Sequence, residues 1–332
     1  HALRNESFVG GESVTKFEEE FAKYIGTKFA TSVNSGNAAL HLSLLALGIN
    51  NESSVITSTN SFIASTNCIL MTGAKPILCD IKPEDGNIDI SSTDEKADAI
   101  IPVHIYGNPC DFDSIREVSE ENKIPVIEDA CQAHGAKYFD KKVGSLGDVG
   151  CFSFYPTKNM TVGGDGGMIT TNNEEIQNEV ISLRDNGRKS HTTHDKLGFT
   201  MRLNTVNAAI GRMQLRHLDE RNSRRQKIAE LYKKHLSEDY FLTENPNGSS
   251  VFHQIIFRHK KRNDIMEHLS KNGIGATIHY PIPIHKQPLY SYLNLTLSIS
   301  EEFSNQVLSL PSYPQLSDDD VKIVCETISQ IL

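Results

Sequence analysis

Lys158 is the residue of this sequence whose type and setting best suit covalent chemistry. It lies between an aromatic segment, 151-CFSFYP-156, and a glycine-rich segment, 163-GGDGG-167. A buried lysine has a lowered pKa, and its free amine can attack a carbonyl carbon or carry a proton. The simpler alternative is a surface lysine on a turn. The glycine-rich segment lacks the GxGxxG and Walker patterns, so it is a weak nucleotide-binding signal.

An acidic pair ends another apolar segment, 126-VIEDACQAHGA-136. Glu128 and Asp129 stand where we expect a buried parallel strand to end. Open α/β sheets bind their ligands at the carboxyl ends of such strands, so either carboxylate could face a ligand. The alternative is that the pair caps the turn that follows.

Small polar residues open an apolar helix in 33-VNSGNAALHLSLLALG-48. Ser35, Gly36 and Asn37 would leave backbone N–H groups free at the helix start, where a phosphate can bind. An ordinary N-cap is the alternative, and this segment alone favours it.

Together these three features fit one cofactor, pyridoxal phosphate. It requires a lysine for its Schiff base, an acid that keeps the pyridine nitrogen protonated, and amide donors for its phosphate. Lys158, Asp129 and residues 35–38 supply one of each. The sequence therefore predicts a pyridoxal phosphate site with Lys158 as the catalytic residue.

The elements that must position these residues follow from the alternation of two patterns. Short apolar runs with a β-branched bias predict strands, and segments with helical periodicity lie between them. Repeated βα units of this kind form a mostly parallel sheet with helices on both faces, a three-layer α/β/α fold. Thr15 and Glu18 predict a capping box for the first full helix. The predicted strands are 29–33, 53–57, 75–79, 98–103 and 124–128, and the predicted helices are 13–25, 37–47 and 111–121.

The pattern changes after residue 202. A long helical segment extends to about residue 236, and a strand within 251–260, a helix at 262–272, a short strand at 276–280 and two closing helices follow. We therefore predict a large cofactor-binding α/β domain over 1–202. Residues 203–332 are predicted to form the linking helix and a smaller C-terminal α+β domain.

Composition limits the other classes of function. A net charge of −9 argues against nucleic-acid binding, and no apolar run is long enough to suggest a membrane span. The six cysteines lack CxxC spacing, which predicts free thiols in a reducing, cytoplasmic setting. His191 and His194 form an HxxH without a third ligand, so no metal site is predicted.

Several segments, in order along nearly the whole chain, resemble the DegT/StrS family of sugar aminotransferases, which have the aspartate aminotransferase fold (fold type I). This resemblance implies that Lys158 forms the Schiff base and moves the proton, and that Asp129 binds the pyridine nitrogen. The segments are 33-VNSGNAALHLSLLALG-48, 59-TNSFIASTNCI-69, 102-PVHIYGNPCD-111, 128-EDACQAHGA-136, 152-FSFYPTKN-159, 163-GGDGGMITT-171, 184-RDNGR-188 and 279-HYPIPIHKQPLY-290.

The resemblance also assigns the other cofactor contacts. Gln132 matches the position that contacts the ring oxygen, and Phe62 matches the aromatic residue that stacks on the pyridine. Each could instead simply pack in the fold. The phosphate positions that it assigns are Gly36, Asn37 and Ser153, and Asn37 replaces the family's usual threonine.

Two positions concern the neighbouring subunit in a homodimer. Thr200 stands where the family usually has an asparagine that reaches the phosphate of the partner's cofactor. Arg202 matches the basic position that follows. The resemblance implies that each active site is completed across a two-fold axis.

The implied reaction transfers an amino group from L-glutamate to a nucleotide-linked keto-deoxysugar, with the 3-keto position slightly favoured over the 4-keto position. The alternatives are a non-catalytic regulator, a sugar dehydratase and a nucleotide-dependent enzyme. Lys158 argues against the dehydratase, because family members of that type have histidine there. The candidate substrate-binding residues are His104, Tyr106, Tyr155, Arg202, His279, Tyr280 and His285.

Overall fold

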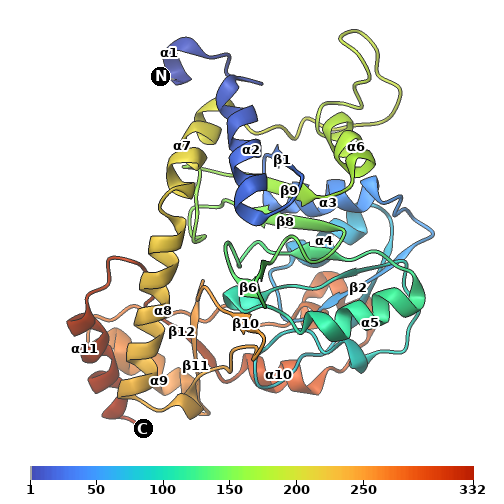
Figure 1. Cartoon of the computed structure of the whole chain (residues 1–332). Helices are drawn as coiled ribbons and strands as arrows, with labels where there is room; N and C mark the ends of the chain where they lie inside the picture. The colour runs from blue at the N-terminus through green and yellow to red at the C-terminus, as the bar shows by residue number, and fades with distance from the viewer. Residues whose placement is uncertain (1) are drawn as a thin grey trace.

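The computed structural model describes residues 2–332, and a mostly parallel sheet forms its centre (Figure 1). Two ladders, β3-β2-β4 and β1-β9-β8-β5, are joined by parallel bridges from Ile100 to Val126 and from Val103 to Asp129. β9 runs antiparallel to both of its neighbours, β1 and β8, and the other strand pairs in this sheet are parallel. The strands are β1 (Phe29–Val33), β2 (Ser54–Ser58), β3 (Lys75–Cys79), β4 (Ala99–Ile101), β5 (Ile127–Asp129), β8 (Val149–Ser153) and β9 (Gly167–Thr171).

Both faces of this sheet are buried in a hydrophobic core. Alternate residues of a strand point to opposite faces, so one strand contributes to both cores. On β8, Cys151 belongs to the core under α3, whereas Phe152 packs with Phe17 and Phe21 of α2. The layers on the two faces confirm the predicted α/β/α arrangement. The helices of this part are α1 (Ala2–Asn5), α2 (Glu12–Ile25), α3 (Gly36–Ala46), α4 (Ala64–Met71), α5 (Phe112–Asn122) and α6 (Glu174–Arg184).

The predicted capping box of the first full helix is wrong. Helix α2 begins at Glu12 after Gly11 and has no side-chain cap. Glu18 instead accepts hydrogen bonds from Ser32 and pairs with Arg184. The Glu18 carboxylate, which the sequence predicted to cap the helix, thus forms a tertiary ion pair with Arg184 instead.

The long helical segment is two helices rather than one. Helix α7 (Thr205–Leu215) ends before Arg216, and α8 (Leu218–His235) begins after His217. Figure 1 shows them end to end along one side of the molecule, from the N-terminal helices to the C-terminal part.

A second core lies in the C-terminal part and is built from residues of 228–331. It packs α8, α9 (Arg262–Lys271) and α11 (Asp318–Ser329) around β11 (Ile255–Arg258) and β12 (Val307–Leu310), an antiparallel pair. The predicted strand at 276–280 is wrong, since only Thr277 makes a bridge, to Ser309. Helix α10 (Ser298–Ser304) was predicted, whereas β12 was not.

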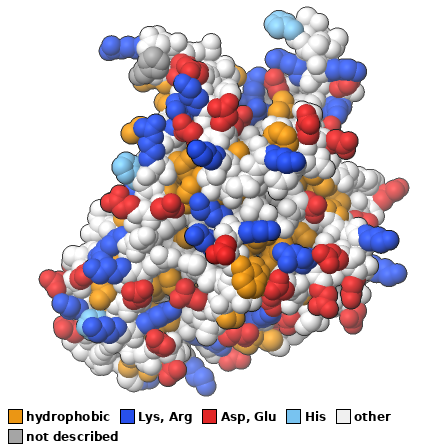
Figure 2. All heavy atoms as spheres, viewed as in Figure 1, with side chains coloured by type: hydrophobic (Ala, Val, Ile, Leu, Met, Phe, Trp, Pro, Cys, Tyr) orange, Lys and Arg blue, Asp and Glu red, His pale blue; other side chains and the backbone are white. Residues whose placement is uncertain are grey.

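All six cysteines are free, as predicted. No helix within residues 2–332 combines the length and the apolar character that crossing a membrane requires. On the face in Figure 2, acidic and basic side chains are interspersed.

The remaining elements are short. The short strands are β6 (Lys137–Tyr138), β7 (Lys141–Lys142) and β10 (Gly248–Ser249), and the 3-10 helices are η1 (Ile90–Ser92), η2 (Ile105–Gly107), η3 (Glu238–Tyr240), η4 (Ile284–Lys286) and η5 (Pro288–Leu293).

Candidate active site

A cavity of about 440 Å³ lies where β5 and β8 end and α3 begins. Segments from the C-terminal part, around residues 253–254 and 279–280, close its other side. Most of the predicted site residues line this cavity, although they come from distant parts of the chain. They are Ser35, Gly36, Asn37, Phe62, Asp129, Gln132, Ser153, Tyr155, Lys158, His279 and Tyr280.

The start of α3 forms the anion-binding end of the cavity. The Ser35 hydroxyl accepts the N–H of Ala38 at 3.1 Å, so Ser35 is an N-cap as well as a cavity residue. The N–H groups of Gly36 and Asn37, at the first turn, have no intrahelical acceptor. A Cβ at Gly36 would lie 2.7 Å from the Cβ of Ser153, so only glycine lets the helix start approach β8 this closely. These N–H groups and the Ser153 hydroxyl form a set of donors that fits a phosphate.

Asp129 supplies the carboxylate of the cavity and is 4% exposed. Its Oδ2 accepts a hydrogen bond from Ser65 at 2.7 Å, and its Oδ1 accepts the N–H of Cys131 at 3.2 Å. The two contacts fix the carboxylate while its oxygens keep capacity for a further donor. Such a carboxylate fits a protonated ring nitrogen.

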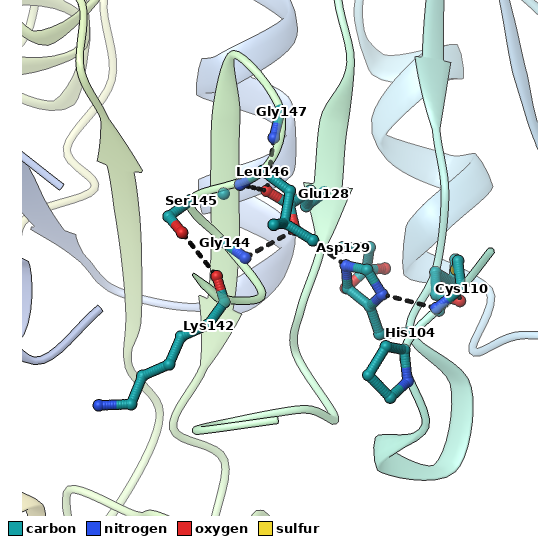
Figure 3. Close-up of polar contacts among 12 residues, drawn as sticks. His104, Cys110, Glu128, Asp129, Lys142, Gly144, Ser145, Leu146 and Gly147 are labelled. Atoms are coloured by element: carbon teal, nitrogen blue, oxygen red, sulfur yellow. Dashed lines mark hydrogen bonds and ion pairs between the residues drawn. The ribbon is translucent and has the colours of Figure 1, made fainter. Parts of the chain in front are cut away.

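Glu128, the neighbouring acid, points to the opposite side of β5 and has a structural role (Figure 3). Its carboxylate accepts the N–H groups of Gly144, Leu146 and Gly147 at 2.7 to 2.8 Å. The Nε2 of His104 lies 3.0 Å from the same carboxylate. Glu128 therefore anchors the turn that leads into β8.

Three residues that were predicted to bind substrate do not line the cavity. His104 is fully buried, with Glu128 at Nε2 and the N–H of Cys110 at Nδ1. His285 is buried too, and its nitrogens contact Thr59 and Glu301. Both imidazoles form hydrogen bonds within the fold and lie outside the lining of this cavity.

Tyr106, the third of these residues, lies behind the cavity. Its N–H donates to Gln132 Oε1 at 2.9 Å, and Gln132 Nε2 donates to the Tyr280 hydroxyl at 2.9 Å. The rings of Tyr106 and Tyr280 stack at 6.2 Å. Both tyrosines have a positive φ, 59° and 58°, a strained backbone conformation that this network holds in place.

Lys158 lies half-buried in the cavity wall. Burial lowers the pKa of its amine, and the negative charge of Asp129 opposes that shift. Burial and the Lys158 charge lower the pKa of His279 to about 4, and its Nδ1 lies 2.7 Å from Ser309 Oγ. The cavity that contains the lysine is thus lined by the buried carboxylate of Asp129, the exposed carboxylate of Asp165 and a histidine, His279, whose pKa is lowered.

Thr200 and Arg202 do not line this cavity. The Thr200 hydroxyl donates to Asn186 at 3.1 Å, and Arg202 pairs with Asp185 at 2.6 Å. A site within one chain therefore does not use them, and their predicted contacts with a partner's cofactor remain predictions.

Sequence reasoning missed several residues that line or support the cavity. Ser65 and Cys131 hold Asp129, and His253 and Gln254 come from the segment just before β11. A signal existed for the last two, since a polar pair interrupts the apolar run 251-VFHQIIF-257.

Comparisons with known proteins agree with this geometry. The model of the DegT/DnrJ/EryC1/StrS aminotransferase family matches residues 1–329. A dTDP-3-amino-3,6-dideoxy-alpha-D-galactopyranose transaminase of Aneurinibacillus thermoaerophilus is 39% identical over 97% of this chain and 90% of its own length. A pleiotropic regulatory protein of Geobacillus stearothermophilus is 37% identical over 99% of this chain and 91% of its own.

Solved structures are similar as well. S. venezuelae DesV in complex with a ketimine intermediate has a TM-score of 0.96 and 34% identity, covering 99% of this chain and 91% of that chain. The ntda protein of Bacillus subtilis with bound cofactor PMP has a TM-score of 0.89 and 32% identity. The match covers 98% of this chain and 79% of that chain.

Proposed function

Because this chain belongs to the DegT/DnrJ/EryC1/StrS aminotransferase family, we propose that its cavity transfers an amino group from L-glutamate to a nucleotide-linked keto-deoxysugar. The chain is a pyridoxal-phosphate-dependent sugar aminotransferase. The observation that carries the proposal is the meeting of Lys158, Asp129 and the start of α3 in one cavity.

Bound there, pyridoxal phosphate supplies an electrophilic carbonyl and an electron-withdrawing ring. The N–H groups of Gly36 and Asn37 and the Ser153 hydroxyl would bind its phosphate. Asp129 would keep a proton on the ring nitrogen, and the aromatic side chain of Phe62 in the cavity lining would pack against the ring.

Lys158 would attach the cofactor, and its free amine would move a proton to and from the substrate carbon. Burial lowers the pKa of this amine, so a larger fraction is unprotonated near neutral pH and can act as the base. The same side chain serves the glutamate half and the sugar half of the reaction.

We assign the sugar to the side of the cavity where Tyr155, His279 and Tyr280 lie. These residues offer hydroxyl and imidazole groups, which suit ring hydroxyls. The favoured position of amination is C3, as in the name of the Aneurinibacillus relative. Amination at C4 is the alternative.

A regulatory role is the second candidate function, because the Geobacillus relative is named a regulatory protein. A regulator would bind the cofactor or an amino sugar without turnover. The presence of a lysine with a lowered pKa beside a fixed carboxylate favours catalysis.

The test is a visible absorbance spectrum of the protein with pyridoxal phosphate, before and after L-glutamate, followed by nucleotide-linked 3-keto- and 4-keto-sugars. We expect a band that L-glutamate bleaches and one keto-sugar restores. Lys158→Ala should not show this cycle, whereas the exposed-lysine variant Lys260→Ala should behave as wild type. A stable band with every donor and sugar would support the regulator, and no band would exclude both.

A further inference from the structure

A second cavity, of about 360 Å³, adjoins the Lys158 cavity. Its outer walls are residues 275–277 and 309–312 of the C-terminal part. Because the Lys158 cavity has to hold the cofactor as well as the reacting sugar, the rest of a nucleotide-linked sugar extends beyond it. The second cavity offers that space. The two cavities share four wall residues, Thr157, His253, Gln254 and His279.

The lining of the second cavity suits phosphate and ribose groups. None of the described residues that line it is an aspartate or a glutamate, so a diphosphate meets no like charge there. Hydroxyl groups can both donate and accept hydrogen bonds, and four lining residues carry them: Thr157, Thr277, Ser309 and Ser312.

Asn159 determines which ring nitrogen of His253, in the shared wall, carries the proton. Asn159 Nδ2 donates to the carbonyl of Val251 at 3.0 Å and to Asn222 Oδ1 at 2.9 Å. A carbonyl can only accept, so this network fixes the orientation of the Asn159 amide. Its Oδ1 lies 3.2 Å from His253 Nδ1, which must therefore be the donor.

The other ring nitrogen of His253, Nε2, then carries a lone pair that faces open space. The ring is only 7% exposed, and no residue within 2–332 forms a hydrogen bond with Nε2. Nε2 is not among the fully buried polar atoms that lack a partner, so it is accessible from the cavities that His253 lines. Burial holds the pKa of His253 well below its usual value, so the ring stays neutral and Nε2 stays an acceptor.

An acceptor in this wall favours a ligand that has a hydrogen-bond donor. The carboxylates of L-glutamate only accept, and its amino group is the one that reacts with the cofactor. The hydroxyl groups of a sugar ring or of a ribose can donate. The lone pair on His253 Nε2 therefore suits the sugar half of the reaction and not the glutamate half.

We propose that the second cavity binds the part of the nucleotide-linked sugar that extends beyond its reacting carbon, and that His253 is a specificity-determining residue there. Its Nε2 accepts a hydrogen bond from a hydroxyl of the sugar ring or of the ribose, and Asn159 maintains the tautomer that makes this possible. The inference rests on the proposed function in taking a nucleotide-linked sugar as the substrate.

The first experiment measures the two half-reactions separately through the visible band. His253→Phe keeps the ring shape without the acceptor. It should bleach with L-glutamate at the wild-type rate, but the keto-sugar concentration that restores half of the band should rise about tenfold, the effect of one hydrogen bond. His253→Gln places an amide oxygen near the position of Nε2 and should recover most of this loss.

The exposed His235→Gln is the control for that experiment and should match wild type in both half-reactions. The same dependence on keto-sugar in wild type and His253→Phe would overturn the inference. So would a His253→Phe protein whose L-glutamate step is slowed as much as its sugar step, because the histidine would then not act on the sugar alone.

The second experiment needs no cofactor. ¹⁵N spectra of histidine-labelled apo protein are recorded before and after addition of UDP-glucose, dTDP-glucose, GDP-mannose or the matching nucleoside diphosphates. The proton of His253 should be on Nδ1, and ligand should shift the Nε2 signal. A shift with a nucleoside diphosphate alone assigns the donor to the ribose, and a shift only with the nucleotide sugar assigns it to the sugar ring. A proton on Nε2, or an Nε2 signal that none of these ligands moves, would overturn the inference.

The two experiments separate this inference from the proposed function. A wild-type protein without a visible band, or with a band that neither L-glutamate nor any keto-sugar changes, would overturn the proposed function. The ¹⁵N shift would still decide whether His253 contacts a nucleotide sugar, because it is measured without the cofactor.

Discussion

Glu128 and Asp129 show how residue type alone leaves a role undecided. Both are buried carboxylates at the end of β5, but alternation along the strand directs them to opposite sides. Asp129 faces the cavity, whereas Glu128 binds the turn at residues 144–147. Only Asp129 is therefore placed to act on a cofactor.

Asp129→Asn should keep cofactor attachment through Lys158 but slow the L-glutamate half-reaction by at least about a hundredfold, because a neutral amide does not hold a proton on the ring nitrogen. Stopped-flow absorbance measures that rate. Asp165→Asn, which removes an exposed carboxylate of the same cavity, is the control and should change the rate little. Equal rates in wild type and Asp129→Asn would exclude this role.

His134 should make stability depend on pH. It is fully buried between Phe152 and Phe154, neither ring nitrogen has a hydrogen-bond partner within residues 2–332, and burial lowers its pKa to about 3. The unfolded chain, with a pKa near 6.5, then binds more protons than the fold between these values, so stability falls as pH falls below 6.5.

His134→Leu should remove this contribution. The unfolding free energy of the variant minus that of wild type should increase by up to about 1.4 kcal/mol for each unit that the pH is lowered below 6.5. Urea unfolding at pH 7.5, 6 and 5 measures the difference. Parallel pH curves for the two proteins would contradict the prediction.

At the scale of elements, the start of α3 depends on Gly36. In Gly36→Ala the new methyl group would meet Ser153 and Cys131, so the helix start must move away from β8. Affinity for pyridoxal phosphate should fall at least about tenfold, since charge-assisted hydrogen bonds to its phosphate lengthen. Absorbance titration measures this. Gly275→Ala adds a methyl group in open space, and its affinity should match wild type.

The turn before β8 depends on Glu128. Glu128→Ala leaves one buried and two partly buried N–H groups and the buried His104 without their acceptor, which should lower the unfolding free energy by roughly 3–5 kcal/mol. Urea denaturation measures this, with Glu120→Ala on the exposed side of α5 as the control. A loss equal to that of the control would show that the turn does not need the carboxylate.

At the scale of the whole molecule, the predicted homodimer can be tested at Thr200 and Arg202. They lie outside the cavity of their own chain, and we propose that a two-fold dimer places them at the partner's cofactor. Lys158→Ala and Arg202→Ala proteins should each be inactive, because each lacks part of every site. After subunit exchange, mixed dimers contain one site with both residues, so activity should return. No recovery in exchanged dimers would place Arg202 outside the shared site.

Much of the large α/β part could be predicted from sequence, because buried parallel strands are short apolar runs that local pattern reveals. β1 and β3 match their predicted ranges, and β2 differs by one residue. The C-terminal part was harder. β12 is only Val307–Leu310 and pairs with a distant strand, while 276–280 has strand-like residues but only one bridge.

The sequence by itself determined the chemistry that is possible: one lysine in a distinctive segment, an acid at a strand end and a helix start with free N–H groups. These depend on residue type and near neighbours, which a sequence displays directly. Tertiary structure decided which polar residues face the cavity. His104 and His285 form hydrogen bonds inside the fold, whereas His253 lines the same cavity as Lys158. The reason is physical: a polar side chain is directed by the partner that satisfies it, and these partners lie up to 226 residues away along the chain.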